Sequence, residues 1–121
     1  MATGAEMPIV TVGCKISDAI IEMSKKGLGV VTITDKQGDL AGILTDGDLR
    51  RAIERKTDMY EDIVDSVMTG NPQWIKEDIL AAEALRMLKN NSLNNYPVVD
   101  ADKKVIGVIT WQMIVKKGIV V

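Results

Sequence analysis

The chain repeats itself once, at a spacing of 65 residues. Segment 35–45, DKQGDLAGILT, aligns without a gap with segment 100–110, DADKKVIGVIT, so that Gly42 matches Gly107 and Thr45 matches Thr110. Apolar residues at helical spacing recur at the same offset, namely Ile16, Ala19, Ile20 and Met23 in one copy and Ala81, Ala84, Leu85 and Leu88 in the other. A chance agreement of this kind at one offset is improbable, so we infer a duplicated unit.

Each copy is predicted to run strand, helix, strand, strand, helix. The first copy gives strands at 9–12, 30–34 and 40–44, a turn at 35–39, and helices at 17–26 and 46–55, with Ser17 as the expected N-cap. The second copy gives strands at 73–76, 96–99 and 104–109, a turn at 101–103, a helix at 79–90 and a final helix. The polar stretch between the copies is predicted to be a helical connector.

A single copy of about 60 residues would bury too little surface to be stable alone. We therefore expect the two copies to pack their sheets face to face and share a core. The predicted fold class is α/β, an α+β sandwich of two β-α-β-β-α repeats with pseudo-two-fold symmetry. Equivalent clefts are expected where the copies meet.

Composition excludes several classes of function. The chain has no histidine, which removes His-based catalysis and His–metal sites. Its net charge of −2 argues against nucleic acid or a membrane as partner, and no apolar stretch reaches the length of a membrane span. A single cysteine, Cys14, and the lack of a secretory signal predict a cytoplasmic protein, with Cys14 as a packing residue.

The most informative stretch for chemistry follows the third predicted strand. Thr45 ends that strand, and Asp48 lies one turn into the next helix. The spacing fits a capping box, in which the two side chains satisfy the first amides of the helix. It also fits a ligand site, in which the hydroxyl and amides hold a phosphate and the carboxylate accepts the two hydroxyls of a ribose. Arg50 and Arg51 either face an acidic sugar or phosphate or are solvated surface charges.

The duplicated unit, ending each time in glycine, two apolar residues and threonine, resembles the cystathionine-β-synthase (CBS) domain pair, or Bateman module. The run 44–51, LTDGDLRR, with Thr3, Gly4 and Pro8 upstream, is similar to the C-terminal CBS pair of D-arabinose 5-phosphate isomerases of the sugar-isomerase (SIS) superfamily. The resemblance implies a CBS domain over residues 4–56, a connector over 57–68 and a CBS domain over 69–118. Nothing in the chain resembles the catalytic SIS domain, so we expect a non-catalytic regulatory module.

The resemblance also implies a nucleotide-type ligand in a cleft between the repeats. Thr45 would contact phosphate or ribose and Asp48 the ribose hydroxyls. Four further residues would line the base pocket: Val10, Thr11, Gly29 and Val30. Kdo synthesis, the pathway of the resembled isomerases, ends in CMP-Kdo. This nucleotide sugar is therefore a candidate ligand, as are AMP and ATP. We expect that no cofactor is required. The expected partners are an N-terminal SIS domain of the same parent protein and further copies in a homodimer or higher homo-oligomer.

The second copy departs from the ligand pattern. Thr110 is retained, but Met113 stands where the carboxylate is expected, and a thioether cannot accept two hydroxyls. Trp111 is expected either to stack on a base or to cover the cleft. Two alternatives remain open: a structural oligomerisation module without ligand, and, more remotely, a Mg²⁺-dependent phosphatase using Asp46 and Asp48.

Overall fold

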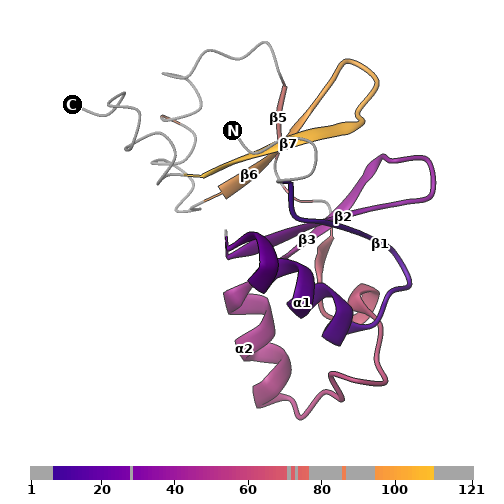
Figure 1. Ribbon diagram of the computed structural model, residues 1–121, viewed down its shortest axis with the longest axis vertical. Coiled ribbons are helices and arrows are strands. Elements are labelled where there is room, and N and C mark those ends of the chain that lie inside the picture. Colours follow the sequence, from indigo (N-terminus) through magenta and orange to yellow (C-terminus); the bar gives the residue numbers. More distant parts are fainter. Residues whose placement is uncertain are drawn as a thin grey trace. The chain divides into compact units, whose positions relative to one another are not determined.

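The computed structural model describes residues 7–27, 29–70, 72, 74–76, 86 and 95–110. The chain divides into two compact units, one formed by residues 8–72 and the other by residues 73–121 together with 1–7 (Figure 1). Within the residues that the structure describes, each unit contains one sheet.

The first unit holds a four-stranded sheet in the order β1-β2-β3-β4. Its elements follow the chain as β1 (Ile9–Thr11), α1 (Ile16–Lys26), β2 (Val30–Thr34), β3 (Leu40–Thr45), α2 (Asp46–Glu54), the 3-10 turn η2 (Val64–Ser66) and β4 (Thr69–Gly70). Strand β1 is parallel to β2, whereas β2–β3 and β3–β4 are antiparallel. The elements predicted for the first copy are therefore confirmed. Each predicted end lies within one residue of the observed end.

Both helices of this unit contribute to one hydrophobic core with the sheet. Val31, Ile33 and Leu44 project from β2 and β3 into the cluster. Ala19 and Met23 of α1 and Ala52 of α2 are buried in the same cluster, so one face of the sheet is covered by both helices. Every residue of β2 is buried, as its uninterrupted β-branched sequence predicts for a strand covered on two faces.

The second unit reproduces the strand pairing of the first at the same offset. Strand β5 (Ile75–Lys76) is parallel to β6 (Asn95–Val99), which is antiparallel to β7 (Val105–Thr110). Val30 pairs with Thr45 and Asn95 with Thr110, so both partners shift by 65 residues. The irregularity after Ile33 in β2 recurs at the equivalent place in β6. The predicted duplication is thus confirmed at the level of backbone register.

The two hairpin turns are also built alike. The Asp35 carboxylate accepts the amides of Gln37 and Asp39, at 2.9 and 3.0 Å. The Asp100 carboxylate accepts the amides two and four residues later, at 2.8 and 3.0 Å. The fourth position of each turn has a left-handed backbone, with φ of 88° at Gly38 and 65° at Lys103. The second copy therefore carries a side chain where the first uses glycine, which is the less strained residue there.

The start of α1 differs from the prediction. Ser17 lies inside the helix, and the N-cap is Lys15, whose side chain makes no capping hydrogen bond. The free amides at this end are satisfied by a distant segment instead: Ile16 N donates to Asp62 O at 3.0 Å and Ser17 N donates to Met59 O at 2.8 Å. Tertiary contacts therefore do what a side-chain cap was expected to do.

The helix predicted within the connector 57–68 is wrong. This stretch is fully described, and its helical part is the three-residue 3-10 turn η2. The Asp58 carboxylate accepts the amides of Tyr60 and Glu61, at 3.0 and 3.1 Å, which gives the backbone a local alternative to helix. The rest of the stretch runs past the start of α1, and Val64 N donates to Cys14 O at 2.9 Å.

Of the helix predicted over 79–90 the structure describes Arg86 alone, which is helical, and the helix predicted at the end of the chain lies outside the described residues. Face-to-face packing of the two sheets, with clefts between the copies, stays a prediction because the positions of the two units relative to each other are not determined. None of the helices in the described part of the chain has the length and apolar character to cross a membrane.

Candidate functional site

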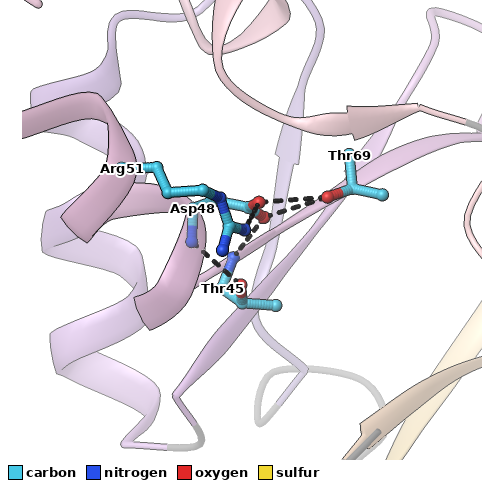
Figure 2. A network of polar contacts seen from close by, with 4 residues as sticks. All are labelled: Thr45, Asp48, Arg51 and Thr69. Atoms are coloured by element: carbon cyan, nitrogen blue, oxygen red, sulfur yellow. Dashed lines mark hydrogen bonds and ion pairs between the residues drawn. The ribbon is translucent and has the colours of Figure 1, made fainter. Parts of the chain in front are cut away.

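Thr45 and Asp48 form a reciprocal capping box where β3 passes into α2. Asp48 N donates to Thr45 Oγ1 at 3.2 Å, and Thr45 N donates to Asp48 Oδ2 at 3.0 Å. Figure 2 shows these contacts at the first turn of the helix. The structural interpretation of this motif is therefore confirmed: the two side chains satisfy backbone donors that the helix itself leaves without partners.

The Asp48 carboxylate also accepts hydrogen bonds from two other side chains. Arg51 Nη2 donates to Oδ1 at 2.6 Å, and Thr69 Oγ1 lies 3.0 Å from Oδ1 and 3.3 Å from Oδ2 (Figure 2). Asp48 is only 4% exposed, whereas the side chain of Arg51 is 58% exposed and Thr69 is exposed as well. A buried carboxylate is thus held in place by two side chains that remain open to solvent.

The guanidinium of Arg51 folds back over the start of α2. A Cβ atom built on Gly47 would lie 3.4 Å from Arg51 Nη1 and 3.6 Å from Thr45 Oγ1, which are ordinary van der Waals contacts, so both side chains lie close to this glycine. A positive charge and the amides of a helix N-terminus both favour an anion nearby. Arg50, the other predicted arginine, is exposed on α2.

Gly29 and Val30 lie at the same end of the sheet as the capping box. Val30 is the direct partner of Thr45 across β2 and β3. Gly29 precedes it with φ of 72°, and a Cβ atom there would lie 3.3 Å from a carboxylate oxygen of Asp46. The structure therefore brings these two predicted residues next to the start of α2.

Val10 and Thr11 are not brought to that end of the sheet. They pair with Ile33 and Thr34, which are the last two residues of β2, whereas Val30 is its first. Their role as ligand contacts stays a prediction, but the Val10 side chain packs against the helix-covered core. The reason is the alternation of side chains along β1, which turns Val10 inward and leaves Thr11 exposed.

In the second copy, Thr110 ends β7 opposite Asn95, as Thr45 ends β3 opposite Val30. Trp111 and Met113 lie outside the described residues, so their predicted roles stay predictions. Within the described stretches, no three His, Cys, Asp or Glu side chains gather to hold a metal ion.

Thr69 is the residue of this network that the sequence did not indicate. It lies 21 positions after Asp48, and it reaches the carboxylate because β4 pairs with β3 through Ile43–Thr69 and Gly42–Gly70. Gly42 permits this close approach, since a Cβ atom there would lie 2.8 Å from Thr69 O and 2.7 Å from Met68 Sδ. A glycine within a strand can mark such an approach, but it does not identify the side chain that arrives.

Cys14 packs against the core of the first unit, as expected. Its burial, with the negative charges of Asp18 and Asp65 nearby, raises the pKa of the thiol above its usual range. The neutral thiol is therefore favoured, which is the opposite of what a nucleophilic cysteine needs.

The amino-acid sequence is similar to a known protein family and to several known proteins. The family model described as "CBS domain" matches residues 4–55 and 64–119. Arabinose 5-phosphate isomerase KdsD of Pseudomonas aeruginosa is 40% identical over 119 residues, which cover 98% of this chain and 36% of that protein. The enzyme of the same name from Escherichia coli K12 is 33% identical over 120 residues, again 36% of its length. The chain thus spans about a third of the length of these relatives.

Solved structures show the same fold. CBSX2 in complex with AMP superposes with a TM-score of 0.81 at 24% identity, covering 98% of this chain and 92% of that one. The CBS domain pair of protein MJ0100, in complex with 5′-methylthioadenosine and S-adenosyl-L-methionine, gives a TM-score of 0.83 at 21% identity, covering 97% and 91%. PAE2072 from Pyrobaculum aerophilum, complexed with AMP, gives 0.80 at 14% identity, covering 88% and 81%.

Proposed function

Because this chain belongs to the CBS domain family, we propose that it is a non-catalytic regulatory module that binds a nucleotide at the first turn of α2. Both regions matched by the family model are CBS domains, and together they take up most of the chain. Structures of the same fold have been solved with AMP and with S-adenosyl-L-methionine, which supports an adenine nucleotide as the ligand class.

The observation that carries the proposal is the environment of the Asp48 carboxylate. It is 4% exposed, yet two of its three partners, Arg51 and Thr69, have exposed side chains that can turn away without unfolding the helix. Vicinal ribose hydroxyls can then donate to its two oxygens. Thr45 N keeps its hydrogen bond to the carboxylate, so the capping box and the ribose site can coexist.

The surroundings of the carboxylate suit the rest of a nucleotide. The Arg51 guanidinium beside the helix N-terminus has five N–H donors, so it can pair with a phosphate while Nη2 stays on Asp48. Gly29, which has no side chain, lies at the same end of the sheet and gives a base or sugar access to the backbone. Thr11 lies at the far end of β2, so in this proposal it does not contact the ligand.

The parent protein is proposed to be an arabinose 5-phosphate isomerase. Relatives with this name share 32% to 40% identity with nearly the whole chain, but the chain covers only 35% to 36% of their length. We expect the remainder of the parent to contain a catalytic sugar-isomerase domain that responds to ligand binding here. On this basis CMP-Kdo, the end product of the pathway, belongs in any ligand screen beside adenine nucleotides.

Calorimetric titration of the chain with AMP, S-adenosylmethionine, CMP and CMP-Kdo tests the proposal. At least one of these should bind the wild type, and Asp48→Asn should weaken that ligand by about tenfold or more because a charged acceptor is lost. Asp46→Asn is the matched control, since Asp46 lies in the same turn but is exposed, and it should not weaken binding. Absence of binding by all four ligands would overturn the proposal in favour of a structural oligomerisation module.

A further inference from the structure

Strand β4 is held to its unit by a short pairing with β3 and by one side-chain hydrogen bond. It has only two residues, Thr69 and Gly70, both exposed, and it pairs with β3 at two positions. Its backbone ladder is therefore minimal. The Thr69 hydroxyl adds a hydrogen bond to the buried Asp48 carboxylate, 3.0 Å from Oδ1 and 3.3 Å from Oδ2. Hydrogen bonds to a charged acceptor are stronger than those between neutral groups.

The carboxylate does not have enough free acceptor positions for its present partners and for a ribose. A carboxylate offers about four acceptor positions. Thr45 N, Arg51 Nη2 and the Thr69 hydroxyl already take three of these positions. Two ribose hydroxyls need two positions, so at least one present donor must leave. Thr45 N is fixed by the helix, which leaves the two side chains.

Thr69 occupies the position that a ribose would need. Its hydroxyl lies within hydrogen-bond distance of both carboxylate oxygens, as vicinal hydroxyls bound across the carboxylate would (Figure 2). Arg51 contacts only Oδ1. A ligand that donates to both oxygens while Arg51 keeps its contact with Oδ1 therefore displaces the Thr69 hydroxyl, because only one acceptor position is free.

We propose that Thr69 is a positioning residue that competes with the ligand for Asp48, so that ligand binding releases β4. This inference rests on the proposed nucleotide site and names its regulation. Strand β4 directly precedes, in the chain, the segment that begins the second unit at residue 73. Exchange of a ribose for Thr69 at Asp48 thus converts occupancy of the site into release of β4 from β3.

Thr69→Val removes the hydroxyl while keeping the shape of the side chain, and two variants serve as controls. Thr69→Ser restores a donor, and Thr57→Val makes the same exchange at a threonine just beyond α2, which has no contact with Asp48 in the network described. AMP affinity is measured by calorimetric titration. Amide exchange of residues 68–70 is measured by NMR without ligand and with AMP.

We expect Thr69→Val to bind AMP about tenfold more tightly than the wild type, because the competing donor is gone. Thr69→Ser and Thr57→Val should bind like the wild type. Exchange at residues 68–70 should be faster in Thr69→Val without ligand, and AMP should accelerate it in the wild type. A loss of fold alone would weaken AMP binding rather than strengthen it.

Unchanged or weaker AMP binding by Thr69→Val, in a wild type that does bind AMP, would overturn the competition while leaving the nucleotide site intact. Unchanged exchange at residues 68–70 in this variant would equally overturn the role of Thr69 in holding β4. Binding of AMP by Thr69→Val alone would support the competition in its strongest form. If neither protein binds AMP, this inference falls together with an adenine nucleotide as the ligand.

Discussion

Replacing Asp48 with alanine removes the acceptor of three donors at once, and we expect it to lower the free energy of unfolding by about 3 kcal/mol. Loss of a capping acceptor costs about 1 kcal/mol. The hydrogen bond from the Thr69 hydroxyl to a charged carboxylate contributes about 1.5 kcal/mol. The ion pair with Arg51 contributes at most about 0.5 kcal/mol, because that side chain is 58% exposed and water screens the charge.

Urea unfolding followed by far-ultraviolet circular dichroism measures this loss without any ligand. Asp48→Asn keeps one oxygen that can accept the Thr45 amide, so it should lose about half as much. Asp46→Ala removes an exposed acid from the same turn and should cost only about 0.5 kcal/mol, through the helix dipole. A loss for Asp48→Ala below about 1 kcal/mol, or equal to that of Asp46→Ala, would refute the view that this carboxylate secures α2 and β4.

Three further predictions follow from particular backbone and charge environments. In urea unfolding, Gly38→Ala should lower the free energy of unfolding by about 1 kcal/mol and Lys103→Gly should raise it by about 0.5 kcal/mol. Both positions have a left-handed φ that strains a residue with a side chain. Changes of the opposite sign would contradict this reasoning. Gly42→Ala should lower the free energy of unfolding by about 2 kcal/mol, since its Cβ atom would lie 2.8 Å from the β4 backbone. An unchanged urea midpoint would show that β4 can move away without loss of stability. Iodoacetamide should alkylate Cys14 slowly at pH 8, because the raised thiol pKa leaves little thiolate. Asp65→Asn should accelerate this reaction by lowering that pKa. The side-chain oxygen of the asparagine can still accept the hydrogen bond that Gly13 N donates to Asp65.

The strands and the first pair of helices could be predicted because their signals are local or periodic. The β-branched run of β2, the turn aspartates of the two hairpins and the helical stripe of α1 each lie within a few residues of what they specify. The helix predicted in the connector was wrong because Asp58 and Asp62 satisfy local amides there and favour turns. Periodicity alone does not reveal that competition.

The candidate site was predicted in part for the same reason. Thr45 and Asp48 stand three residues apart, and this spacing alone places each side chain against the other's amide once a helix forms. Val10 was assigned to the ligand by resemblance to the CBS family, and the alternation of so short a strand did not by itself show that Val10 faces the core. Its pairing with Ile33 turns it to the core.

The amino-acid sequence by itself determined the duplication, the register shared by the two hairpins and the capping box. These depend on repeats and on hydrogen bonds within a few residues, where chain geometry leaves few alternatives. Only the tertiary structure decided that Asp62 and Met59 cap α1 in place of Ser17, and that Thr69 reaches Asp48. A backbone carbonyl or a hydroxyl can bond to any donor or acceptor brought near it, and which one arrives is set by the pairing of strands and the packing of loops far along the chain.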